Sequence, residues 1–423
     1  MVKPIHEDTR RYTKIHGRFY FVPLGVTSWI KHLTEETVLS PLNGSRVLDL
    51  SRLLPGPYCT MLLADLGAEV IKIESPLIGD YARMVPAGFG GEALYAAVNR
   101  GKKSVGLNYR NPRGREVFLQ LAREADVVIE TFRPGAVRRW KIDYEAVQAV
   151  NPQVIYCSLS GYGQSGPYAN RAGHDLNYIA IGGLLALNGA LGGPPIPPGV
   201  QIADLAGGML AAIAILATLV GRQRTGQGAY LDVAMLDAVV SWVGPMSGMW
   251  LGAGKQPERG QMPLSGQLPC YNVYETADGQ HITLGALEPH LWASFCEAVE
   301  RRDLLARQLD PAAIAEVAAL FRGRTRDEWL AHFREVDACV EAVNTLDELL
   351  HHPQVQQRGL VAEAAGPGAQ IGSPFRFGGE SRAARAPNLG EHTTELLNRV
   401  GLSDAEIQEL ETARVVKLQT LRA

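Results

Sequence analysis

The sequence predicts an α/β fold in which an open, doubly wound (Rossmann-like) parallel sheet forms a large domain and a smaller α+β domain follows it. Three observations favour this class. Short apolar runs alternate with helical patterns over residues 46–159, a segment rich in Gly, Pro and Gln interrupts the chain at residues 252–269, and a hairpin pattern follows that segment. Short strands that alternate with helices are typical of a parallel sheet with helices on its faces.

The first β-α-β unit is expected at residues 46–74. An apolar run at residues 46–50 predicts a strand, a helical pattern extends to Leu66, and a second apolar run at residues 69–73 ends in Glu74. The alternation continues with helices expected at residues 117–122 and 143–150 and strands at residues 127–129 and 154–159. Because doubly wound sheets bind ligands at the carboxyl ends of their strands, we expect functional residues in the loops at that edge.

A long apolar run at residues 205–221 comes close to spanning a bilayer. It contains Gly207 and Gly208 and lies among enzyme-like motifs, which favours a buried core helix over a membrane span. A strand at residues 229–234 and a helix at residues 237–250 follow it.

The small domain is expected to begin with a hairpin. Its strands are predicted at residues 271–276 and 281–284, around the turn Asp278-Gly279, and helical patterns follow at residues 291–320 and 326–335. The expected divisions of the chain are an N-terminal extension at 1–43, the large domain at 44–250, the small domain at 251–350, and a C-terminal return to the large domain at 351–423 that ends in a helix at 404–421.

Composition narrows the classes of partner. With 41 basic and 44 acidic residues, the chain carries no net charge suited to nucleic acid or to an anionic membrane, so a small-molecule partner is expected. The five cysteines are scattered, without a CxxC pair, which indicates a reducing cytoplasm and predicts no metal site. Residues 1–40 lack the continuous apolar segment of an export signal, and we expect them to form an arm, a lid or a tail.

One motif is misleading. Residues 161–166 match the G-x-G-x-x-G pattern of nicotinamide dinucleotide sites. The continuation at residues 167–171 does not resemble the start of a helix, and no strand ending in an acid follows about 20 residues later. A glycine turn that allows close approach of the chain is therefore the preferred interpretation.

The candidate catalytic groups are His174 and Asp175 in a Gly-rich turn, Asp204 before the long apolar run, and Glu288 after the hairpin. A histidine and carboxylates are the groups that move protons near neutral pH. Three of these residues have ordinary alternatives. His174 could be a structural histidine, and Asp204 could be a helix N-cap. Glu288 could stand at the start of a helix in which Pro289 takes the first helical position.

Two basic segments are candidates for phosphate binding. Asn99, Arg100, Lys102 and Lys103 form a cationic turn with Gly101, and a solvated charge run is an equal alternative. The second segment, which contains Arg133, Arg138 and Arg139, follows the strand expected at 127–129, so it falls at the ligand-binding edge of the sheet.

Taken together, the sequence motifs around these candidate residues resemble those of the α-methylacyl-CoA racemases of the family III CoA-transferase superfamily (CaiB/BaiF type). Besides the catalytic strings, the matching pieces are residues 54–57, 64–72, 133–135, 161–167 and 337–340, and the resemblance extends over about residues 44–380. One departure is Glu341-Ala342, where members of the family commonly carry a proline.

The resemblance implies an isomerase. His174 and Asp204 would be the two bases at the α-carbon of an acyl-CoA thioester, Glu288 would support the imidazole, and the N–H of Asp175 would bind the enolate oxygen. No metal or redox cofactor is implied, because coenzyme A arrives as part of the substrate. The resemblance assigns Arg139, within the segment that begins at Arg133, to the CoA phosphates.

The resemblance also assigns Glu74 to the adenosine and implies an interlocked homodimer with shared active sites. CoA transfer between acids, through an aspartyl-CoA intermediate at Asp175, is the alternative reaction. A non-catalytic CoA-binding protein is a third, more distant alternative. The identity of the acyl group is left open.

Overall fold

The computed structural model describes residues 13–15, 18–20, 40–86, 88, 92–363, 369–376 and 384–419. Of residues 1–39, the structure describes two short antiparallel strands, β1 (Thr13–Ile15) and β2 (Arg18–Tyr20). The expectation of an arm, a lid or a tail at residues 1–40 thus lies largely outside the described residues.

The large domain is built on a seven-stranded sheet with the order β14-β5-β4-β3-β6-β7-β8. Its strands are β3 (Arg46–Asp49), β4 (Glu69–Glu74), β5 (Lys103–Leu107), β6 (Val127–Glu130), β7 (Ile155–Ser160), β8 (Ala229–Ala234) and β14 (Val416–Lys417). All neighbours are parallel except β14 and β5. The chain runs outward from β3 to β5 and then returns to β6 on the other side of β3, which confirms a doubly wound sheet with its switch point between β3 and β6.

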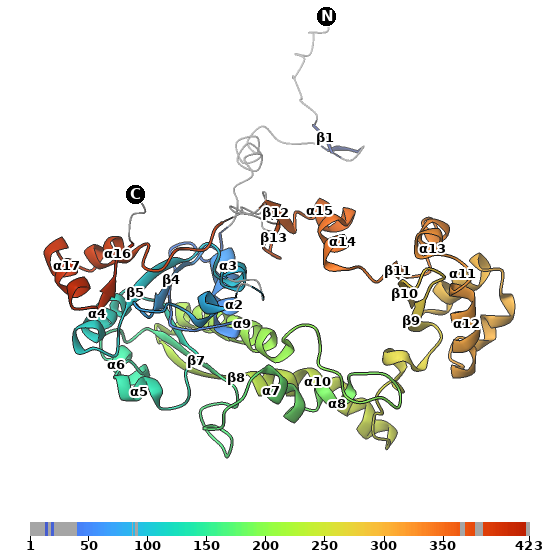
Figure 1. Ribbon diagram of the computed structural model, residues 1–423, viewed down its shortest axis with the longest axis horizontal. Helices are drawn as coiled ribbons and strands as arrows, with labels where there is room; N and C mark the ends of the chain where they lie inside the picture. The colour runs from blue at the N-terminus through green and yellow to red at the C-terminus, as the bar shows by residue number, and fades with distance from the viewer. Residues whose placement is uncertain are drawn as a thin grey trace, which may run out of the picture.

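Helices cover both faces of this sheet (Figure 1). On one face, strand residues such as Leu48 and Val128 pack under α4 (Pro112–Arg123), α5 (Ala136–Trp140), α6 (Tyr144–Gln148), α16 (Thr393–Arg399) and α17 (Asp404–Thr412). On the other face, Val47 and Ile155 pack under α2 (Pro55–Asp65) and α9 (Ile202–Thr225). Burial on both faces explains why the strands are short apolar runs without strict alternation.

Helix α9 corresponds to the long apolar run of the sequence. By length and composition it passes as a possible membrane span, but it packs against α2, β7 and α10 (Met235–Ala253). A Cβ atom on Gly207 would lie 2.6 Å from the Met235 side chain, and one on Gly208 would lie 2.5 Å from the carbonyl oxygen of Pro55. The two glycines thus permit the close helix packing expected of a core helix.

The small domain contains a three-stranded antiparallel sheet, β11-β10-β9, with β9 (Tyr271–Glu275), β10 (His281–Gly285) and β11 (Val340–Ala342). The predicted hairpin is confirmed, whereas β11 is an additional strand. Its helices are α11 (Pro289–Ala298), α12 (Ile314–Phe321) and α13 (Arg326–Phe333), with 3-10 turns at Arg302–Arg307 and Pro311–Ala313. The single pattern expected at residues 291–320 is therefore divided, and Pro311 lies at one of the breaks.

The remaining elements connect these parts. They are α3 (Ala93–Asn99), α7 (Asp175–Ile181), α8 (Leu184–Leu187), α14 (Leu346–His351), α15 (Pro353–Gln357), the strand pair β12 (Val361–Glu363) and β13 (Ala369–Ile371), a 3-10 turn at Tyr81–Met84 and a π turn at Pro263–Gln267. Figure 1 shows the small domain apart from the large one, joined to it through α10 and by the return through α14 and α15.

The C-terminal helix was expected to extend from residue 404 to residue 421, and that expectation is wrong in its second half. Helix α17 ends at Thr412, and Arg414 takes a left-handed conformation with φ of 56°. The chain then adds β14 to the edge of the sheet, antiparallel to β5. Val415 and Val416 are buried there, and β-branched residues fit a sheet edge better than the end of a helix.

Candidate active site

The turn before α7 carries two of the candidate groups. His174 is the N-cap residue of α7 and has an extended backbone, and Asp175 is the first residue of the helix. The side-chain oxygen of Asn177 accepts the backbone N–H of His174 at 3.0 Å, which fixes the turn. The His174 side chain is exposed. Among the described residues, the N–H of Asp175 has no hydrogen-bond acceptor, which leaves it available to a ligand oxygen.

Asp175 also joins α7 to α9. Its Oδ1 atom accepts the backbone N–H of Ala203 at 2.6 Å and that of Asp204 at 3.2 Å. The interpretation of Asp204 as a helix N-cap is therefore wrong, because Gln201 is the N-cap of α9 and Asp204 lies in the first turn. The structure thus brings His174, Asp175 and Asp204 together at one place in the large domain.

The environment of Asp204 favours the neutral carboxyl group. Burial raises the pKa of Asp204 to about 7, and the negative charge of Asp175 adds to the effect. A group with a pKa near the working pH is suited to both accepting and returning a proton. This property was not visible in the sequence, since it depends on the packing of α9 against α7.

Gly161 of the misleading motif and Gly173 of the His174 turn have a structural role here. A Cβ atom on Gly161 would lie 2.4 Å from the hydroxyl oxygen of Tyr178, and one on Gly173 would lie 2.7 Å from its ring. The Tyr178 hydroxyl donates to the carbonyl oxygen of Gly173 at 2.6 Å. These glycines let the Tyr178 ring pack under the His174 turn, in agreement with close approach rather than dinucleotide binding.

Glu288 lies in the other domain. It is exposed, it follows β10, and it is the N-cap residue of α11 with Pro289 at the first helical position, as the ordinary alternative predicted. Figure 1 shows α11 far from α7. Within one chain the structure therefore does not bring Glu288 to His174 and Asp204.

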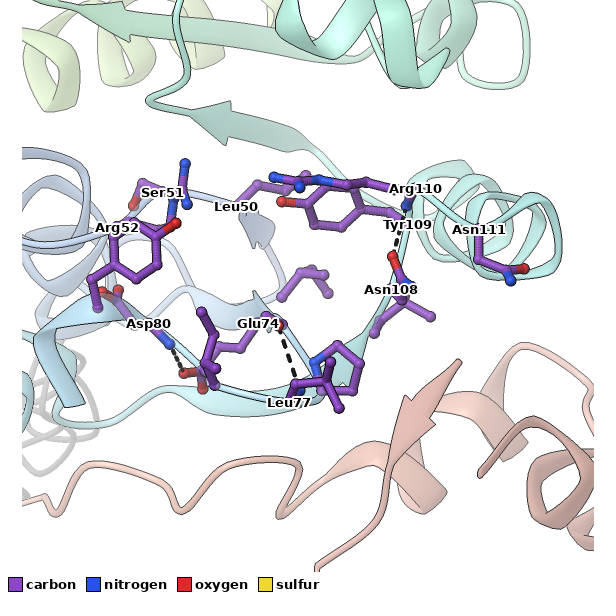
Figure 2. Close-up of a pocket in the computed structure, with 17 residues that line it drawn as sticks. Leu50, Ser51, Arg52, Glu74, Leu77, Asp80, Asn108, Tyr109, Arg110 and Asn111 are labelled. Carbon is purple, nitrogen blue, oxygen red and sulfur yellow. Dashed lines mark hydrogen bonds between the residues drawn. The ribbon is translucent and has the colours of Figure 1, made fainter. Parts of the chain in front are cut away.

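A pocket of about 420 Å³ opens at the carboxyl ends of β3, β4 and β5. Figure 2 shows Arg52 and Arg110 on one side of it and Leu77 on the opposite side. The guanidinium of Arg52 lies 4.6 Å from the ring centroids of both Tyr81 and Phe132, and that of Arg110 stacks on a tryptophan ring at 4.3 Å. The sequence interpretation missed both arginines, although each follows a strand end at the ligand-binding edge.

Glu74 contributes to this pocket but is occupied by partners within the chain. Its carboxylate accepts hydrogen bonds from Arg83, Tyr95, Ser104 and the backbone N–H of Asp80. The residue is 3% exposed. Its contact to adenosine stays a prediction, and in this structure the carboxylate organises the floor of the pocket.

The cationic turn is neither a phosphate cradle nor a solvated charge run in this structure. The Lys102 ammonium group is fully buried and binds Asp49, Thr60, Asn99 and the carbonyl oxygen of Pro57 at 2.7 to 3.1 Å. The two neighbouring cations are also paired within the chain. Arg100 forms an ion pair with Asp65, and Lys103 forms ion pairs with Glu69 and Glu395. The geometry gives no support to phosphate binding by these residues, because their charges are already paired.

Arg133 and Arg139 are different, since both side chains are exposed beyond the end of β6. Among the described residues neither forms an ion pair. Arg139 lies on α5, whose N-terminus follows Gly135 with φ of 77°. Their contact to the phosphates of coenzyme A stays a prediction.

The doubly wound sheet and the pocket at its carboxyl edge are typical of α/β enzymes, which bind their ligands at that edge. The chain matches the model of CoA-transferase family III over residues 42–393 and belongs to that family. It is 36% identical to "Alpha-methylacyl-CoA racemase" of Mus musculus, over 90% of this chain and 99% of that one. It is also 36% identical to "Succinyl-CoA:mesaconate CoA-transferase" of Haloarcula marismortui, over 86% and 97% of the two chains.

A solved structure supports the same assignment. The structure of a CaiB/BaiF family protein from Brucella suis superposes with a TM-score of 0.77 at 32% identity, and the match covers 85% of this chain and 99% of that one. The fold and the family are thus established, and the protein is an enzyme of the CoA-transferase/racemase type.

Proposed function

We propose that the protein racemises 2-methylacyl-CoA thioesters by two-base proton transfer. The observation that carries the proposal is the pair of hydrogen bonds from Ala203 and Asp204 to Asp175, because they hold the Asp204 helix against the His174 turn. The pKa of Asp204, raised by burial to about 7, lets this group take either proton role near neutral pH.

In one direction, Asp204 removes the α-proton and the C–H electron pair moves toward the thioester carbonyl, which becomes an enolate. The N–H of Asp175 donates a hydrogen bond to the enolate oxygen at the N-terminus of α7. His174, as imidazolium, then returns a proton to the opposite face of the carbon, which inverts its configuration. Exchange with solvent restores the proton on His174 and removes it from Asp204.

The coenzyme A part of the substrate is proposed to lie along the carboxyl edge of the sheet. Arg52 and Arg110 line the pocket there, and Arg139 and Arg133 present guanidinium groups beyond β6 that form no ion pair with any residue the structure describes. Arginine is suited to phosphate because its fork of N–H groups can bind two oxygens at once. No further cofactor enters the proposal.

We further propose an interlocked homodimer in which Glu288 of one chain completes the site of the other. The distance between α11 and α7 within one chain supports it. Large apolar side chains also lie exposed along two helices of the large domain, namely Met209, Ile213 and Val220 on α9 and Val240, Trp242, Met249 and Leu251 on α10. Such a face is typical of an extensive subunit interface. The five free cysteines favour a reducing, cytoplasmic location.

CoA transfer is the second candidate, because transferases are as similar to this chain as racemases are. In that reaction a carboxylate oxygen of Asp175 would attack the thioester. Since Oδ1 of Asp175 already accepts two backbone N–H groups at a helix N-terminus, its charge is stabilised and its nucleophilicity reduced. This contact supports the proposal of racemisation over CoA transfer.

The test is incubation of the enzyme with a 2-methylacyl-CoA in deuterated water, with and without an acceptor acid. A racemase incorporates deuterium at the α-carbon without any acceptor. If no deuterium is incorporated and CoA is transferred when the acceptor acid is present, the racemase proposal is wrong and the protein is a CoA-transferase. Tight CoA binding without either reaction would indicate a binding protein.

A further inference from the structure

The N-terminus of α9 is served by a residue from another helix. Gln201, its N-cap residue, makes no side-chain capping bond. The acceptor for the free N–H groups of Ala203 and Asp204 is instead the carboxylate of Asp175, which precedes them by 28 and 29 residues. Among the described residues, the Asp204 carboxylate itself accepts no hydrogen bond.

This arrangement has an electrostatic consequence. The N-terminus of a helix carries about half a positive charge, and it ordinarily stabilises an ionised carboxylate in the first turn. At α9 that positive end is already in contact with the negative charge of Asp175. Asp204 is left partly buried, without a donor and beside a like charge, and all three conditions favour its protonated form.

We propose that Asp175 is a positioning residue for Asp204. Its carboxylate occupies the N-terminus of α9, so that the Asp204 carboxyl group can take up and release a proton near neutral pH instead of staying ionised. This inference rests on the proposed function and adds a role for the Asp175 side chain, distinct from that of its N–H. The two hydrogen bonds to Asp175 and its charge have different roles. The hydrogen bonds fix the position of α9, and the charge sets the proton affinity of the Asp204 carboxyl group.

Other ionisable groups on the elements packed against α9 do not account for the effect. These elements are α2, α7, α10, β7 and β8, and they carry Tyr58, Cys59, Asp65, Tyr156, Cys157, Asp175, Tyr178, Tyr230, Asp232 and Asp237. Among these described groups, Asp175 is the one whose charge raises the pKa of Asp204. Tyr178 responds in turn, because burial raises its pKa to about 12 and the charge of Asp204 contributes to that shift.

The substitution Asp175→Asn separates charge from hydrogen bonding, because the amide oxygen can still accept both N–H groups. In the pH profile of α-proton exchange, the limb that reports Asp204 should move to lower pH by about one unit, while the other limb stays in place. Asp237→Asn is the matched control, because Asp237 is an exposed carboxylate in the first turn of the neighbouring helix α10, and it should leave the profile unmoved. A profile of Asp175→Asn that coincides with that of the wild type would overturn the inference.

A second measurement does not depend on activity. The difference in melting temperature between the parent and its Asp204→Asn variant should change between pH 4 and pH 7, and in the Asp175→Asn background this change should move to lower pH. If the wild type shows no α-proton exchange, the proposed function fails and this comparison still decides the role of Asp175. An equal pH dependence in the two backgrounds would overturn it.

Discussion

The ammonium nitrogen of Lys102 lies 3.1 Å from Oδ2 of Asp49, and both side chains are fully buried. Lys72 lies 3.8 Å from the same oxygen and 2.9 Å from Asp80. Burial alone would raise the pKa of Asp49, but the two ammonium groups overcome this effect and hold the pKa well below its usual range. Burial lowers the pKa of Lys102 to about 8. These charges join β3, β4 and the start of β5 in the interior of the large domain.

Removing one member of this network should be costly. We expect Lys102→Met to lower the free energy of unfolding by about 3–5 kcal/mol, because it leaves an uncompensated charge in the interior. Urea denaturation followed by circular dichroism measures the loss. The control is Lys103→Met, whose ion pairs with Glu69 and Glu395 are partly exposed and should be worth at most about 1 kcal/mol. Equal effects of the two substitutions would contradict the buried network.

The two proposed bases should be indispensable for α-proton exchange but not for folding. His174→Ala and Asp204→Asn are each expected to slow exchange by about 10²–10⁴-fold, the usual contribution of a positioned acid or base. Asp237→Asn, the exposed carboxylate on α10, should retain full activity. Exchange rates come from the loss of the α-proton signal in deuterated water. Full activity in both base variants would remove these residues from the mechanism.

Stability should depend on pH through Asp204. Burial raises its pKa to about 7 in the folded protein, whereas an unfolded aspartate titrates near its ordinary value of 3.8. Between these values the folded state binds more protons, so the stabilisation is complete below about pH 4 and is lost as the pH rises toward 7.

Asp204→Asn should remove this contribution. Relative to the variant, the wild type is therefore expected to become less stable from pH 4 to pH 7, and the comparison cancels all other titrating groups. Melting temperatures measured for both proteins across this range provide the test. Parallel curves would show that Asp204 titrates normally.

The alternation of apolar runs and helical patterns was sufficient to predict the sheet, because each strand and helix is a local pattern. The role of Asp175 was not predictable in this way, since the acceptor for the α9 N-terminus comes from α7, 28 residues earlier. The same limit applies to Lys102, whose burial depends on Asp49 far back in the sequence. Strand β14 was missed because its partner, β5, lies some 300 residues before it.

The proposed shared active site makes a prediction that a monomer could not satisfy. His174 and Asp204 belong to the large domain, whereas Glu288 belongs to the small one, which lies apart in the same chain (Figure 1). In an interlocked dimer, a chain with His174→Ala and a chain with Glu288→Ala together form one site with both substitutions and one intact site. Random association makes half of the dimers mixed, so co-refolding of the two inactive variants should restore about a quarter of wild-type exchange.

A second mixture of variants serves as the control for any recovery of activity. His174→Ala mixed with Asp204→Asn should restore nothing, because both substitutions fall in large domains and every site in the mixed dimer then lacks one base. Sedimentation of the wild type should give a dimer at micromolar concentration, consistent with the exposed apolar side chains on α9 and α10. Recovery in both mixtures would show that the recovered activity does not come from shared sites, and recovery in neither would show that each site is completed by the Glu288 of its own chain.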